Sequence, residues 1–116
     1  MNKGILLNKS IELSIQIINC YKWLCENKKE FVMSKQLLRS GTSIGANIHE
    51  AQFAASRADF IAKMQIALKE ASETEYWLIV LTKTEYLDEH FRYLTDNCVS
   101  LKRMLISTLR TSKNNI

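Results

Sequence analysis

Proline is absent from the sequence, and glycine occurs only three times among 116 residues. Proline interrupts helices and glycine weakens helix interiors, so their scarcity favours long helices joined by short connections. Long apolar runs are absent as well. Residues 5–7 are too few for the core of a signal peptide, and residues 77–81 fall far short of the roughly 20 residues that span a membrane. We therefore expect a cytoplasmic protein that does not enter a membrane.

Cysteine is also scarce, and its positions do not suggest redox or metal chemistry. Cys20, Cys25 and Cys98 are odd in number and form no C-x-x-C pair. Cys20 and Cys98 fall on apolar helix faces, so we interpret them as small core residues of a protein in a reducing compartment. The formal net charge is only +4 at pH 7. This excess permits contact with nucleic acid, but many soluble proteins carry as much.

The abundant residues, Leu, Ile, Ala, Lys and Glu among them, are those of amphipathic helices. A chain of this length can bury one core, so we expect residues 1–116 to form a single domain. Breaks in the apolar pattern predict four helices, over about 8–28, 34–55, 57–83 and 88–112. The predicted fold class is all-α, an antiparallel up-down four-helix bundle.

Each predicted helix has a polar residue near its start that can accept hydrogen bonds from free amides. These residues are Asn8, Ser34, Ser56 and Asp88. Ser56 and Asp59 together approximate a capping box, which favours a short turn before the third helix. The alternative is that the second helix continues through residues 54–55 with only a kink. Between the first two helices, Phe31 and Val32 are predicted to plug the end of the bundle.

The first helix carries apolar residues over a wider arc than one core face needs. Its two stripes are Leu13, Ile17, Cys20 and Leu24 on one side, and Ile11, Ile15 and Ile18 on the other. One explanation is a helix wedged deeply between two neighbours in a monomer. The other is a second face used for self-association. This helix alone does not distinguish between them.

Two glycines one turn apart, Gly41 and Gly45, lie inside the second predicted helix. Each costs about 1 kcal/mol relative to alanine, so a close helix–helix approach is the natural compensation. A membrane dimerisation motif is excluded because Arg39 and Glu50 flank the pair. A phosphate-binding loop is excluded because no Gly-Lys-Ser/Thr follows. We therefore interpret Gly41 and Gly45 as packing residues.

Polar residues at helical spacing form a second stripe on the same helix, and acids on the third helix could face them. The predicted structural polar layer contains Arg39, Ser43, Asn47, Glu50, Glu70 and Glu73. Such layers fix helix register and add little net stability. The alternative is that Glu70 and Glu73, beside Trp77, have raised pKa values and act in acid–base chemistry. The structural interpretation is favoured because the second helix offers matching donors and acceptors.

Metal and nucleophile motifs fail at specific positions. His49-Glu50 begins like H-E-x-x-H, but Phe53 occupies the position of the second histidine. Glu70 and Glu73 have no histidine partner at di-metal spacing. No serine or cysteine lies in a recognisable nucleophile setting. We therefore expect no metal, no cofactor and no enzymatic activity; a nuclease using Glu70 and Glu73 is a distant alternative.

The fourth predicted helix separates an apolar seam from a basic face. The seam has heptad spacing through Leu87, Phe91, Leu94, Cys98, Leu101 and Leu105. The candidate nucleic-acid-binding residues on the far side are Arg92, Lys102, Arg103, Arg110 and Lys113. No aromatic residue for base stacking is interleaved with them, and Val99 and Ile106 lie among the arginines. As a charge pattern alone, this face is more often a solvated surface than a phosphate-binding one.

Three segments in the middle of the chain carry a family resemblance. SGTSIGANIHEA at 40–51, S-x-x-DF at 56–60 and ALKEASETEYWL at 67–78 resemble the bacterial four-helix-bundle proteins encoded in intervening sequences of 23S ribosomal RNA genes. Accessory proteins of diversity-generating retroelements are similar. The resemblance implies a ring-shaped homopentamer and a link to RNA, and it implies a protein partner such as a reverse transcriptase.

Two functions follow as hypotheses. The first is a non-enzymatic oligomer that binds structured RNA or other nucleic acid through its basic surface, together with a protein partner. The second is a purely structural protein-interaction module whose positive charge is incidental. Salt-sensitive RNA binding would separate the two.

Overall fold

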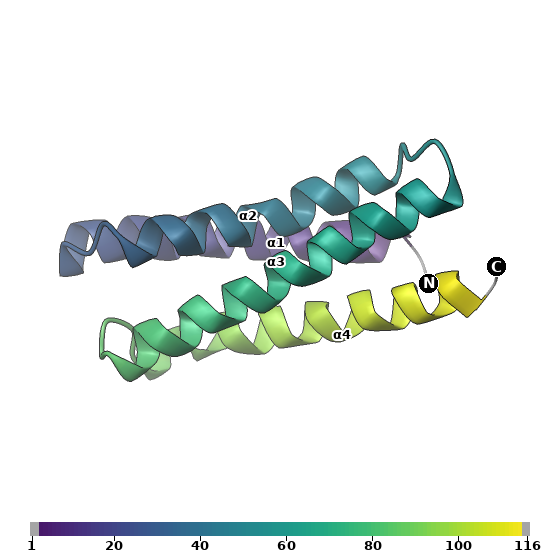
Figure 1. Cartoon of the computed structure of the whole chain (residues 1–116). Helices are drawn as coiled ribbons and strands as arrows, with labels where there is room; N and C mark the ends of the chain where they lie inside the picture. Colours follow the sequence, from purple (N-terminus) through teal and green to yellow (C-terminus); the bar gives the residue numbers. More distant parts are fainter. Residues whose placement is uncertain (1–2, 115–116) are drawn as a thin grey trace.

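The computed structural model describes residues 3–114, and within this range every regular element is helical. The helices are α1 (Lys3–Trp23), α2 (Met33–Ala51), α3 (Arg57–Lys83) and α4 (Arg92–Asn114). A π-helical turn, Leu24–Lys28, extends α1, and a 3-10 turn, Glu89–Phe91, precedes α4. Successive helices run antiparallel in a bundle of 47 × 20 × 19 Å (Figure 1).

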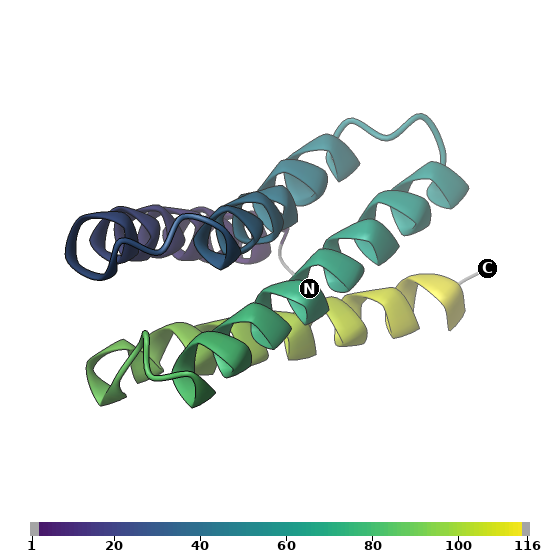
Figure 2. The ribbon, with the colours of Figure 1, turned by 60° about the vertical axis from the view of Figure 1, so that its left-hand side comes forward.

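Each helix packs against its chain neighbours, and α1 also meets α4, which closes the bundle. In both views α3 lies between α2 and α4 (Figures 1 and 2). No helix in the described range is long and apolar enough to cross a membrane. The predicted seam is confirmed as core, since all six of its residues are at most 8% exposed. Its first two residues, Leu87 and Phe91, precede α4.

The first helix begins earlier than predicted. Asn8 was expected to cap it, but the helix starts at Lys3 and Asn8 lies exposed on its surface. The reason is Leu6, which is 2% exposed and packs in the core. Burial of this side chain stabilises the additional turn more than an asparagine cap at residue 8 would.

The start of α2 is capped by a residue outside the helix rather than by Ser34. The Glu30 carboxylate accepts hydrogen bonds from the amides of Val32, Met33 and Ser34, at 3.2, 3.2 and 2.8 Å. Ser34 instead donates its hydroxyl proton to the Glu30 carbonyl at 2.7 Å. The expectation that Phe31 and Val32 plug the bundle end is wrong, because their exposed fractions are 51% and 74%.

The connection between α2 and α3 is a turn, and α2 ends at Ala51 rather than at residue 55. Ser56 accepts a hydrogen bond from the Asp59 amide at 3.1 Å, as the capping-box interpretation predicts. The Asp59 carboxylate accepts one from the Ala55 amide, also at 3.1 Å. These reciprocal bonds satisfy amides that a straight continuation would have paired within the helix.

The two glycines of α2 lie against α1. A Cβ atom on Gly41 would stand 2.8 Å from Ile17 Cγ2, and one on Gly45 would stand 3.2 Å from Ser10 Oγ. Both distances are shorter than ordinary contact, so the backbones approach as closely as glycine allows. On the α3 side, Thr74 donates to the fully buried Ser40 hydroxyl at 3.0 Å.

Candidate nucleic-acid interface

Arg39 joins two acids of α3 at the surface of the α2–α3 pair. It forms ion pairs with Glu73 and, at 3.3 Å, with Glu70. Trp77 Nε1 also donates to the Glu73 carboxylate at 3.1 Å. Hydrogen bonds from Arg39, and then from Trp77, lower the pKa of Glu73 below its ordinary value. Glu73 is therefore ionised at neutral pH, the opposite of what a general acid needs.

The predicted polar layer is not one connected network. Asn47 donates to Ser43, at 2.9 Å to its carbonyl and 3.2 Å to its hydroxyl, so these two residues interact only within α2. Glu50 pairs instead with Lys63 of α3 at 3.0 Å. The layer consists of two separate surface bridges between α2 and α3.

Two of the five predicted cations on α4 are locally neutralised. Arg92 pairs with Glu89 at 3.3 Å, and Lys102 pairs with Glu75 of α3 at 2.9 Å. The Lys102–Glu75 bridge is half-buried and ties α4 to α3. Both residues therefore have a structural partner that competes with any phosphate.

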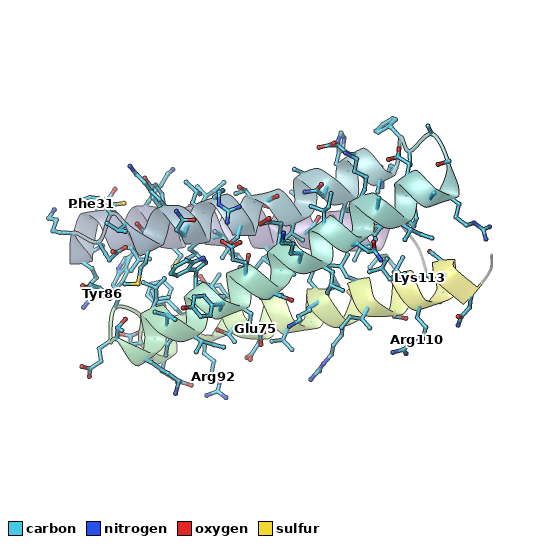
Figure 3. All side chains as sticks on the ribbon, in the orientation of Figure 1. Phe31, Glu75, Tyr86, Arg92, Arg110 and Lys113 are labelled. Atoms are coloured by element: carbon cyan, nitrogen blue, oxygen red, sulfur yellow. The ribbon has the colours of Figure 1, made fainter. Side chains whose placement is uncertain are left out.

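The remaining three cations, Arg103, Arg110 and Lys113, are exposed and form no ion pair with any described residue. They occupy the last three turns of α4, where no acid follows Asp96. Figure 3 shows Arg110 and Lys113 toward one end of the bundle and Arg92 toward the other. The predicted stripe thus reduces to a basic C-terminal part of α4.

The second apolar stripe of α1 is not covered by the other helices. Ile11 and Ile15 are 46% and 55% exposed, and Ile18 is half-buried. The explanation of a helix wedged between neighbours in a monomer is therefore wrong. An apolar face open to water remains available for another protein surface.

Cys20 and Cys98 are buried in the core, and Cys25 is half-buried. Burial raises the pKa of both the Cys20 and the Cys98 thiol to about 12, so neither is a nucleophile at neutral pH. No metal-binding group of histidines, cysteines and acids occurs within residues 3–114.

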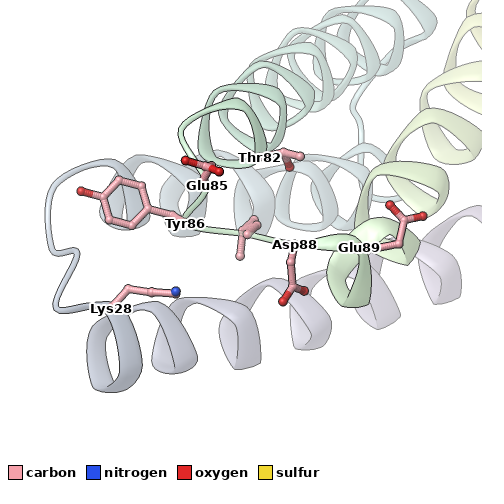
Figure 4. Close-up of a pocket in the computed structure, with 7 residues that line it drawn as sticks. Lys28, Thr82, Glu85, Tyr86, Asp88 and Glu89 are labelled. Carbon is pink, nitrogen blue, oxygen red and sulfur yellow. The ribbon is translucent and has the colours of Figure 1, made fainter.

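A recess of about 440 Å³ lies beside the α3–α4 connection (Figure 4). Its polar lining includes Lys28, Glu85, Asp88 and Glu89. Asp88 is already used there, because its carboxylate accepts the His90 amide at 2.9 Å. The recess therefore contains charged surface groups of both signs but no nucleophile–base pair.

Fold and surface together define a small helical-bundle protein whose described outer faces carry charged and apolar side chains. A family model matches residues 2–107, and the chain belongs to the 23S rRNA-intervening sequence protein family. This confirms the family resemblance read from the central segments.

One similar solved structure is a crystal structure of a protein of unknown function from the S23 ribosomal protein family, from Bacteroides thetaiotaomicron VPI-5482. Its TM-score is 0.92 and its sequence identity is 51%, over 95% of this chain and 99% of that chain. A search of curated proteins found no match.

Proposed function

We propose that this chain forms a non-enzymatic assembly that binds structured RNA through the basic C-terminal part of α4. The observation that carries the proposal is the set of three exposed cations, Arg103, Arg110 and Lys113, which have no acidic partner among the described residues. Unpaired exposed cations can exchange their solvent contacts for phosphate contacts and release counterions from the nucleic acid. Membership of the 23S rRNA-intervening sequence protein family supports RNA as the nucleic acid.

Self-association, as a homopentameric ring, is the second part of the proposal. Its support is the exposed apolar face of α1 with Ile11 and Ile15, together with the family resemblance. A ring would repeat the three cations in every subunit, and the attraction for a polyanion grows with their number. Each subunit would contribute its own phosphate contacts, so the ring would bind one RNA with higher affinity than a single subunit does.

The proposal assigns no catalytic step to the protein. The carboxylate best placed for acid–base work, Glu73, is held in its ionised form by Arg39 and Trp77. A protein partner, such as a reverse transcriptase, and a cytoplasmic location complete the proposal.

A second function, a protein-interaction module, is favoured by one observation. Ile106 is 37% exposed and lies among the arginines of α4, where a partner protein could cover it. In that case the cations would border a protein interface rather than hold phosphates.

The two functions can be separated by exchanging Arg103 and Arg110 for Gln together. We expect weaker RNA binding and a shallower slope of log affinity against log salt, with the oligomer retained. The matched control exchanges Lys22 and Lys35 for Gln, which removes the same charge from exposed positions on α1 and α2. Loss of the oligomer in the Arg103/Arg110 variant would support the protein interface. No RNA binding by the wild type at low salt would reject the RNA function.

A further inference from the structure

Phe53 is the most exposed large apolar side chain in the described part of the protein, at 77%. It lies in the turn between α2 and α3, where its amide donates to the Glu50 carbonyl at 3.0 Å. Its ring stands 5.5 Å from that of His49, tilted by 58°. The backbone of this turn needs no aromatic side chain, and the ring buries little surface in the bundle. An exposed ring held beside a second ring is a stacking platform.

The same end of the bundle holds Arg110 and Lys113, two cations of α4 that form no ion pair with any described residue. The α2–α3 turn and the end of α4 lie at one end of the long axis (Figure 1), and Arg110 and Lys113, both exposed, lie toward that end (Figure 3). The two acids nearest the turn are occupied, Glu50 by Lys63 and Asp59 by the Ala55 amide. The opposite end carries charged groups of both signs around the recess of Figure 4, with Lys28 among the acids.

We infer that the end with Phe53 receives RNA that presents an unpaired base, in a loop or at a single-stranded end. Phe53 stacks on the exposed base, while Arg110 and Lys113 contact phosphates elsewhere on the same RNA. The exposed cations favour a polyanion. The exposed ring favours RNA with unpaired bases, because a continuous duplex hides the faces of its bases. This inference rests on the proposed function and specifies the class of RNA and the end of the protein that binds it.

The test compares two RNA probes of equal length at one salt concentration. One is a hairpin with 2-aminopurine in its loop, and the other is a blunt duplex without unpaired bases. We expect the wild type to prefer the hairpin and to change the 2-aminopurine fluorescence on binding. Phe53→Ala should bind the hairpin about tenfold more weakly and leave duplex binding unchanged. Phe31→Ala is the matched control, because Phe31 is also exposed but lies at the opposite end.

The outcomes separate this inference from the function on which it rests. Equal affinity for both probes, or an equal effect of Phe53→Ala and Phe31→Ala, would overturn the stacking role while leaving RNA binding in place. A smaller oligomer in Phe53→Ala would overturn it too, by assigning the ring to a contact between copies. Failure of the wild type to bind either probe would reject the proposed function itself.

Discussion

Glu30 shows how one side chain can decide where a helix begins. Burial would raise the pKa of this carboxyl group, but hydrogen bonds from the amides of Ser34, Met33 and Val32 outweigh burial and lower the pKa. The folded protein therefore stabilises the charged form of Glu30, which accepts hydrogen bonds from three otherwise free amides at the start of α2. The cap was not predicted because Glu30 lies four residues before Ser34, outside the usual capping position.

We predict that Glu30→Gln destabilises the fold by about 1–2 kcal/mol at pH 7, as loss of a helix cap does. Because the folded pKa lies below the ordinary value of 4.5, the contribution is complete above that pH. It is lost as the pH falls through the folded pKa. Urea unfolding of both proteins from pH 7 to pH 3 should show the difference shrinking below about 4.5. A difference that stays constant over this range would contradict the charged cap.

Gly41 provides a second prediction at this scale. Alanine in a helix interior is favoured over glycine by about 1 kcal/mol, so a glycine in open space should be improved by substitution. At Gly41 the new Cβ would stand 2.8 Å from the fully buried Ile17. We therefore expect Gly41→Ala to lower the melting temperature measured by circular dichroism. Gly4→Ala, at an exposed position of α1, is the control and should leave it unchanged or higher.

At the scale of helices, the α2–α3 pair is joined by a buried hydroxyl pair, Ser40–Thr74, and by two surface bridges. The Arg39 side chain is 52% exposed, which places its ion pairs in high dielectric. Such pairs contribute little to stability because water and salt screen them. Orientation of α3 against α2 thus depends more on apolar packing than on the predicted polar layer.

We predict that Arg39→Met costs less than about 1 kcal/mol of unfolding free energy. A double-mutant cycle with Glu73→Gln should give a small coupling energy that falls further in 1 M salt. The measurement is urea unfolding at two salt concentrations. A cost of several kcal/mol that salt does not change would mean that the bridge is buried in an assembled form of the protein.

The sequence predicted the helices well where apolar residues recur at regular spacing. It predicted them poorly where a single side chain decides where a helix begins or whether a turn is buried. The predicted heptad seam contains six buried residues with regular spacing, four of them in α4, so this core face could be assigned without the structure. The Ser56–Asp59 cap follows a known local pattern. The early start of α1 depends instead on Leu6 reaching the core, and residues 31–32 are exposed although both are apolar. Burial at chain ends and turns depends on tertiary contacts, which spacing does not encode.

The candidate site divides in the same way. Spacing placed five cations on one face of α4, but pairing partners on other elements decide which of them remain free. Glu75 on α3 pairs with Lys102 on α4, although the two residues are 27 positions apart in the sequence. The exposure of Phe53 could not be read from the sequence, because an apolar residue next to a helix end is as often buried.

At the scale of the whole molecule, the exposed α1 face leads to a prediction about assembly. Sedimentation equilibrium of the wild type at micromolar concentration should show a discrete species well above 13.4 kDa, and about five times that mass for a pentamer. Ile11→Gln combined with Ile15→Gln should shift the protein toward 13.4 kDa, because the change makes the exposed face polar. A wild-type monomer would reject the assembly. An unchanged oligomer in the variant would move its interface to another face.

An even number of antiparallel helices has a practical consequence for protein engineering. The start of α1 and the end of α4 lie at the same end of the bundle as Lys113 (Figures 1 and 3). A purification tag fused to either terminus would emerge beside the surface proposed to bind RNA, and a polyhistidine tag would alter its charge. A tag inserted in the α3–α4 connection, between Lys83 and Glu89, would project from the far end of the molecule. Immobilising the protein through that connection would leave the basic end turned toward solution.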